Sequence, residues 1–136
     1  MIRPCYIIAP YAGDVDRNVA RACLLGRLAL AHGLAPVVVH PAIRAGVYGD
    51  DDVAEERERG LAASIEVALL VVMAFGDVWV LSNDDGSLSD GCAREWRACG
   101  EYAKPRNRHG WRFGTWLDRR NDFEAAGLGE QWTRLR

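Results

Sequence analysis

The chain has 136 residues, of which 49% are hydrophobic, and this size predicts one compact domain with a sizeable core. Its formal net charge of -2 creates no field that would attract nucleic acid or an anionic membrane surface. No apolar run approaches the roughly 18 residues of a membrane span, and the start MIRPCYIIAP lacks a signal-peptide pattern. We therefore expect a cytoplasmic protein with no nucleic-acid or membrane partner.

Strand and helix patterns alternate in the first part of the chain. The apolar run CYIIA, residues 5–9, predicts a buried parallel strand, and residues 18–32 have the pattern of a helix that Gly33 ends. Residues 35–40, APVVVH, predict a second strand. We expect a loop over residues 41–52, because glycine, proline and an acidic run occur there without a sustained period.

The next helix pattern, residues 53–75, changes character along its length. Its first half is polar, whereas its second half, VALLVVMAF, is apolar nearly all round. Such a segment must be buried on several sides, either under the sheet or against another chain. We favour contact with a second copy, so the sequence predicts a homodimer or a higher homo-oligomer.

The last part of the chain begins with a clear pattern that then weakens. DVWVL, residues 77–81, predicts a third strand, followed by a loop over 82–89 and a helix over 90–103. GWRFGTWL, residues 110–117, is a candidate fourth strand, and residues 123–135 form a weak helix pattern interrupted by two glycines. The alternation predicts an α/β fold of the Rossmann or flavodoxin kind, a parallel sheet with helices on both faces.

In such a sheet, ligands bind at the carboxyl ends of the strands, beside the helix N-termini. Residues 9–18, 40–52 and 82–95 occupy that edge. The first of these segments is neither a GxGxxG nor a Walker loop, so a dinucleotide site of the usual kind has little support and a P-loop is excluded. The four cysteines form no CxxC pair and the three histidines are scattered, so we expect no metal and no organic cofactor.

The segment SLSDGCAREW, residues 87–96, follows the third strand. Ser89 is a candidate N-cap, and Gly91 removes a side chain where a ligand can approach. Local sequence allows two interpretations of Glu95: a solvated residue of an ordinary capped helix, or a functional carboxylate. Because capping patterns are common, the local sequence alone favours the first interpretation.

Four stretches taken together resemble the nucleoside 2-deoxyribosyltransferase superfamily, and above all its small bacterial and phage members. They are CYIIAPYAGDVDRNVARA, GLAPVVVH, DVWVL and SDGCAREW, which parallel the family patterns YIAGPY, PxxPH and SxGMxxE. The match covers about residues 4–104, and the order and spacing of the pieces are more specific than any single piece. The resemblance implies an α/β enzyme that acts on a nucleoside or nucleotide.

The resemblance also implies roles for three residues. Glu95 stands where the family has its nucleophile, a carboxylate that attacks the anomeric carbon as the base departs and so forms a glycosyl-enzyme. Tyr6 stands where the family has a tyrosine that orients this glutamate. Ser89 matches a serine near the 5'-phosphate in nucleotide-specific members, whereas free-nucleoside transferases carry an aspartate that would repel a phosphate. A nucleoside 5'-monophosphate is therefore the expected substrate.

Further binding residues are implied by the first two edge segments. The turn that contains Pro10, Tyr11, Gly13 and Asn18 would supply backbone amides to the sugar and phosphate. His40 would face the base or the sugar, although a histidine bonded to loop backbone fits the sequence equally well. With Ser89 and Gly91, these residues complete the expected substrate site.

Several features depart from the family pattern. Characterised members protonate the leaving base with an acid on the helix before the third strand, and that region here offers Glu66 among apolar residues. Desolvation would raise the pKa of Glu66 and make it the acid, or it is an interface salt-bridge partner. Asp77 is interpreted as structural, and Arg17, Arg57 and Arg94 either add charge to the site or are solvated.

The tail beyond residue 104 has no match, so the single domain of residues 1–136 diverges from about residue 105. We expect an N-glycosidase that hydrolyses the base–sugar bond of a nucleoside 5'-monophosphate through a covalent glycosyl-glutamate. Hydrolysis is preferred over transfer to a second base, because nothing in the loop 41–52 demonstrates a seal against water. A non-catalytic nucleotide-binding module of the same fold is the other alternative, and a purely structural protein would bind no ligand.

Overall fold

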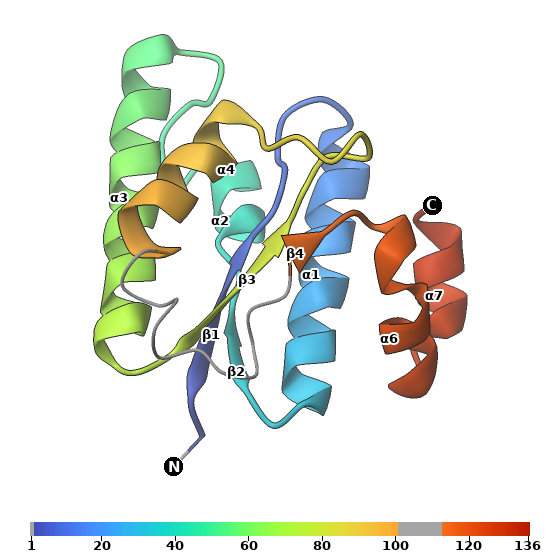
Figure 1. Cartoon of the computed structure of the whole chain (residues 1–136). Helices are drawn as coiled ribbons and strands as arrows, with labels where there is room; N and C mark the ends of the chain where they lie inside the picture. The colour runs from blue at the N-terminus through green and yellow to red at the C-terminus, as the bar shows by residue number, and fades with distance from the viewer. Residues whose placement is uncertain (1, 101–112) are drawn as a thin grey trace.

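A computed structural model describes residues 2–100 and 113–136 and shows an α/β fold (Figure 1). All strand pairs are parallel, and the strand order is β2-β1-β3-β4. The strands are β1 (Pro4–Ile8), β2 (Ala35–Val37), β3 (Asp77–Leu81) and β4 (Phe113–Gly114). This is the start of the flavodoxin order, in which the order of strands in the sheet reverses between β1 and β3 and a ligand site forms beside that switch point.

Helices cover both faces of the sheet, which confirms the predicted fold class (Figure 1). In chain order they are α1 (Val15–Ala31), α2 (His40–Arg44), α3 (Ala54–Met73), α4 (Asp90–Glu95) with a π-helical continuation (Trp96–Gly100), a 3-10 turn (Leu117–Arg119), α6 (Arg120–Ala125) and α7 (Gly129–Arg134). Alternation along β1 divides its side chains between two cores. Cys5 and Ile7 join the core on the α1 side, and Tyr6 and Ile8 join the core on the α3 side.

The elements before α3 differ from the sequence prediction at their ends. Helix α1 begins at Val15 rather than at residue 18, because the side chain of Asp14 caps it by accepting from the Arg17 amide at 3.2 Å. Strand β2 ends at Val37, since the chain turns into the short helix α2 at His40. This helix replaces the start of the expected loop, and the proline in its first turn suits a helix start.

Helix α3 buries one stripe and exposes another. Ser64, Val71 and Val72 are buried, whereas Leu70 is 64% exposed and Met73 is 72% exposed. The sheet therefore accounts for one side of the apolar second half of this helix, as one of the two sequence interpretations expected. Contact between two copies of the chain stays a prediction.

The C-terminal helices complete the core on the α1 side. Trp116, Phe123 and Trp132 are buried there together with residues of α1. The Trp116 indole donates to the Trp132 carbonyl at 3.3 Å, and the Trp132 indole donates to the Trp116 carbonyl at 2.9 Å. The expected terminal helix is split into α6 and α7, because the chain turns at Gly127 with a φ of 75°.

Two expected elements extend beyond the described residues. The third predicted helix forms as α4 and its π-helical continuation up to residue 100, and residues 101–103 lie outside the description. Residues 110–112 of the expected fourth strand also lie outside it, and the described part of that strand is only β4. Among residues 2–100 and 113–136, no helix combines the length and the apolar character that a membrane span requires.

Candidate functional site

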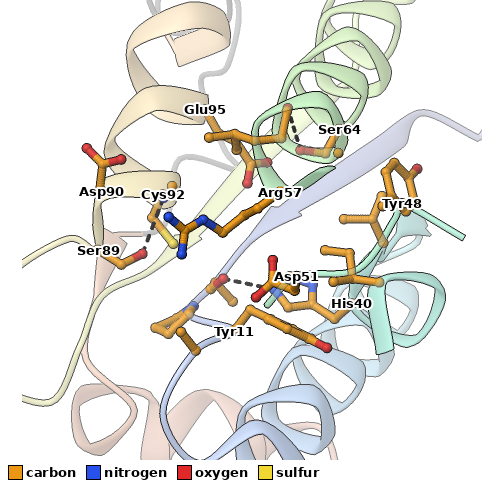
Figure 2. Close-up of a pocket in the computed structure, with 18 of the residues that line it drawn as sticks. Tyr11, His40, Tyr48, Asp51, Arg57, Ser64, Ser89, Asp90, Cys92 and Glu95 are labelled. Carbon is orange, nitrogen blue, oxygen red and sulfur yellow. Dashed lines mark hydrogen bonds between the residues drawn. The ribbon is translucent and has the colours of Figure 1, made fainter. Parts of the chain in front are cut away.

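A pocket of about 340 Å³ lies at the carboxyl edge of the sheet (Figure 2). The loop after β1, helix α2 with the loop that follows it, the first half of α3 and the segment around the start of α4 form its walls. Six residues predicted from the sequence line it, namely Pro10, Tyr11, His40, Ser89, Gly91 and Glu95. The fold therefore brings together segments that are far apart in the chain, at the edge where α/β proteins bind ligands.

Tyr6 and Glu95 form a direct contact behind this pocket. The Tyr6 hydroxyl donates to Glu95 Oε2 at 2.6 Å. Tyr6 is fully buried in β1, while Glu95 is half-buried at the end of α4 and lines the pocket. Because strand alternation directs Tyr6 to the face that α4 covers, the tyrosine holds one carboxylate oxygen in place.

The surroundings of Glu95 oppose its charged form. Burial raises the pKa of Glu95 to about 7, and the hydrogen bond from Tyr6 acts in the opposite direction. Burial and the nearby Glu95 carboxylate raise the pKa of Tyr6, so its hydroxyl keeps its proton and remains a donor. A carboxyl group that titrates near neutral pH in a pocket is typical of functional sites.

The start of α4 is built as the sequence predicted. Ser89 Oγ accepts from the Cys92 amide at 3.3 Å, which caps the helix. The hydroxyl proton of Ser89 is not used in this bond. A Cβ on Gly91 would meet only Leu61 Cδ1, at 3.9 Å, so open pocket space lies beside this glycine.

The chain belongs to a protein family. The family model described as "Domain of unknown function (DUF7768)" matches residues 3–108. This is a DUF7768 protein. The matched range includes the Tyr6–Glu95 pair and every wall of the pocket, and it ends before α6 and α7. No curated protein and no solved structure matches the chain significantly.

Two predicted binding residues of the DUF7768 domain shape a loop and do not line the pocket. The Asn18 amide donates to the carbonyl groups of Tyr11 at 3.2 Å and Ala12 at 2.9 Å. Gly13 has a φ of 97°, and nothing lies within 4 Å of a Cβ built on it. Both residues therefore fix the turn that presents Tyr11 to the pocket, rather than contacting that space themselves.

His40 is bonded to loop backbone, as one interpretation of the sequence expected, and it also lines the pocket. Its Nε2 lies 2.8 Å from the Ala9 carbonyl oxygen and donates to it, while the same side chain lines the pocket. Burial lowers the pKa of His40, so the ring is neutral and Nδ1 is an acceptor. Within the described part of the chain, this buried Nδ1 atom has no hydrogen-bond partner.

Glu66 is exposed and does not line the pocket. It follows the pocket residue Leu61 by five positions, which places it roughly 140° around the helix axis. Its immediate neighbours Ile65 and Val67 are half-buried, whereas Glu66 lies with Leu70 on the exposed stripe of the helix, where its carboxylate is in water. Of the two interpretations of Glu66, the structure therefore gives no support to a desolvated leaving-group acid in this pocket.

The remaining charged candidates divide into paired and unpaired groups. Asp77 is structural, as predicted, because it is 2% exposed and pairs with Arg3 at 2.8 Å. Arg94 bonds Glu58 at 2.8 Å. Arg57, in contrast, lines the pocket, and no side-chain hydrogen bond or ion pair with another described residue holds its guanidinium group.

Asp51 and Tyr48 were not singled out in the sequence, yet both line the pocket. Both belong to the loop between α2 and α3, which has no sustained period, so only its position at the ligand edge was predictable. Asp51 is half-buried, and no ion pair or hydrogen bond within the described residues engages its side chain. The described ranges of the DUF7768 domain contain no group of three or more histidine, cysteine or acidic side chains arranged to hold a metal ion.

Proposed function

We propose that the protein is an N-glycosidase that hydrolyses the base–sugar bond of a nucleoside 5'-monophosphate, with Glu95 as nucleophile. The observation that carries this proposal is the 2.6 Å bond from the Tyr6 hydroxyl to Glu95 Oε2 at the wall of the pocket. A carboxylate that is partly desolvated and held in one orientation is suited to attack an electrophilic carbon. The sequence resemblance to nucleoside 2-deoxyribosyltransferases supplies the substrate class.

In the first step, an oxygen of ionised Glu95 bonds to the anomeric carbon while the bond from that carbon to the base nitrogen breaks. The electron pair of the broken bond leaves with the base, which takes a proton. Water then attacks the anomeric carbon, loses a proton and releases the Glu95 carboxylate. The developing positive charge on the sugar is stabilised by the carboxylate.

The phosphate end of the substrate lies, in this proposal, beside Ser89 and Arg57. Figure 2 shows the Arg57 guanidinium extending into the pocket beside Ser89 and Cys92. The Ser89 hydroxyl has a proton to donate, and an arginine without a partner among the described residues is suited to a phosphate oxygen. The two groups come from different elements, so together they define one end of the ligand.

Asp51 is the carboxyl group that we assign to the leaving base. Among the other acidic groups of the pocket, Glu58 bonds Arg94, which lowers the pKa of Glu58 and opposes its protonation. Asp90 is exposed, with Arg94 at 3.9 Å. Asp51 is half-buried, lines the pocket and pairs with no cation among the described residues, so it is the carboxyl group that we place beside the leaving base.

The test is base release from a panel of ribo- and deoxyribonucleoside 5'-monophosphates, followed by chromatography. Glu95→Gln should abolish release, whereas Glu66→Gln, the same chemical change at an exposed glutamate outside the pocket, should retain it. Full activity of Glu95→Gln would overturn the nucleophile assignment. If the wild type releases no base but nucleotides raise its melting temperature, the non-catalytic binding module replaces the hydrolase.

A further inference from the structure

We propose that the pocket selects a nucleotide whose base carries an amino group next to a ring nitrogen, as cytosine and adenine do, and that Asp51 and His40 recognise that edge. This inference rests on the proposed function, which defines the ligand as a nucleotide. It adds the class of base, which the resemblance and the fold leave open.

The positions of the polar groups in the pocket indicate which side of it the base occupies. Figure 2 shows Ser89 and the Arg57 guanidinium toward one side of the pocket and His40 and Tyr48 toward the other, with Asp51 beside His40 and Glu95 between the two groups. In a nucleotide the sugar separates the phosphate from the base. If the anomeric carbon faces Glu95 and the phosphate faces Arg57, the base occupies the side that holds Asp51 and His40.

His40 presents an acceptor on that side. Its Nε2 proton is committed to the Ala9 carbonyl at 2.8 Å, so Nδ1 carries a lone pair and no proton. The side chain is 3% exposed, and Nδ1 has no partner among the described residues. An unpaired buried acceptor is unfavourable, and a small shift of the ring or of Tyr11 beside it would let a ligand N–H group satisfy it.

Asp51 presents the second acceptor. A carboxyl group accepts a hydrogen bond in either protonation state. The exocyclic amine of cytosine or adenine has two N–H groups, one for an Asp51 oxygen and one for His40 Nδ1. An oxo group in place of the amine has no N–H group to donate to these two acceptors, so the same pocket would bind the oxo base less tightly.

The surroundings of Asp51 reinforce this preference. The pocket adjoins a second cavity of about 510 Å³ that shares Tyr11 and Asp51 with it and is also lined by Asp50, Asp52 and Glu56. One cation, Arg44, lines this cavity too, and its charge is paired with Asp16. These carboxylates give the base side a negative potential, which attracts N–H groups and repels carbonyl oxygens. Asp50, Asp52 and Glu56 supply the electrostatic potential, and Asp51 and His40 supply the hydrogen bonds to the base.

The experiment measures binding to Glu95→Gln protein by calorimetry, so that no ligand is consumed. The probes are two matched pairs, the 5'-monophosphates of cytidine and uridine and those of adenosine and inosine, which differ in an amino or an oxo group. The amino member of at least one pair should bind about tenfold or more tightly, as expected for one well-made base contact. Asp51→Asn should reduce this ratio several-fold, because an amide can also donate to an oxo group, while Glu55→Gln, at an exposed site outside both cavities, should preserve it.

Each outcome bears on the inference separately from the proposed function. Equal affinities within both pairs, or a ratio that Asp51→Asn leaves intact, would overturn the inference, even if the wild type releases base from all four nucleotides. An amino preference that depends on Asp51 would support it, even if no base is released and the hydrolase proposal fails. Binding of none of the four nucleotides would overturn both.

Discussion

Tyr6 and Glu95 are 89 positions apart in the chain, and the Tyr6 hydroxyl nevertheless lies 2.6 Å from Glu95 Oε2. The sheet order explains this contact, because β3 pairs directly with β1 and is followed by the helix that carries Glu95. The tyrosine is buried in the strand, so the carboxylate is held from the interior while its other side faces the pocket. The orientation of the proposed nucleophile therefore depends on one hydroxyl group, which also opposes the effect of burial on the pKa of Glu95.

The first prediction concerns that hydroxyl. Tyr6→Phe keeps the ring in the core and removes the bond that lowers the pKa of Glu95, so this pKa should rise above about 7. Because Glu95 acts as a carboxylate, base release should fall about tenfold at neutral pH and recover in part at higher pH. The measurement is kcat/KM as a function of pH, and the ascending limb of this profile should shift to higher pH. An unchanged midpoint in the variant would show that Tyr6 does not tune Glu95.

The second prediction concerns stability. Glu95 has a pKa of about 7 in the folded protein against an ordinary value of 4.5, so folding favours its protonated form. Its favourable contribution is fully present below pH 4.5 and is lost as the pH rises through about 7. Glu95→Gln removes the titration and keeps an oxygen for the Tyr6 hydroxyl, so at pH 8 the variant should be more stable by up to about 3 kcal/mol.

Urea unfolding of both proteins at pH 5 and pH 8 measures this effect. The advantage of the variant should be clear at pH 8 and small at pH 5, since at the lower pH Glu95 is neutral in the folded wild type. A constant difference between the two proteins across this range would contradict the raised pKa. The result also bears on function, because a binding or catalytic group is often retained at the expense of stability.

The third prediction concerns the phosphate end. Arg57→Gln should lower kcat/KM for nucleoside 5'-monophosphates by about 10- to 100-fold, as expected from the loss of a charge-assisted hydrogen bond. It should change activity on the corresponding free nucleosides far less. Arg59→Gln is the matched control, because Arg59 is exposed on the same helix and does not line the pocket. Equal losses of kcat/KM on nucleotides and nucleosides would show that Arg57 does not bind the phosphate.

How much of the fold and of the site could be predicted depends on how far apart in the sequence the interacting residues are. Strand β3 has the predicted bounds, 77–81, because a continuous apolar run between turn residues fits a strand buried on both faces. The Ser89 cap is a local interaction and was also predicted. The pairing of Tyr6 with Glu95 is not local, and it was expected only because several motifs in order resemble a known family.

The positions of Glu66 and Asp51 relative to the pocket were not predicted, for physical reasons that the sequence contains in part. Glu66 was considered as the acid because the resembling family carries one on this helix and because apolar residues surround it, whereas helical phase turns it away from the face that Leu61 presents to the pocket. Asp51 lies in a loop whose path depends on tertiary contacts, and no period in the sequence indicates where its side chain points.

Arg57 was one of three candidate arginines, and only the three-dimensional structure separates it from the arginines that pair with protein carboxylates.

The last prediction concerns the attachment of the C-terminal segment. Arg21 is buried in α1, where its Nε donates to the Leu135 carbonyl at 2.7 Å and its Nη1 donates to Asp84 at 3.1 Å. Its guanidinium also lies over the Trp116 ring, 5.0 Å from the ring centroid. One side chain thus links the helix after β1, the loop after β3 and the end of the chain.

Arg21→Met keeps an unbranched side chain in this position and removes both hydrogen bonds, so the free energy of unfolding should fall by about 1–3 kcal/mol. Arg27→Met, at an exposed position on the same helix, should change it by less than about 0.5 kcal/mol. Urea denaturation followed by tryptophan fluorescence measures both variants, since Trp116 and Trp132 report on this region. Equal stabilities of the two variants would show that Arg21 does not fasten the C-terminal helices, and that their apolar contacts with α1 hold them unaided.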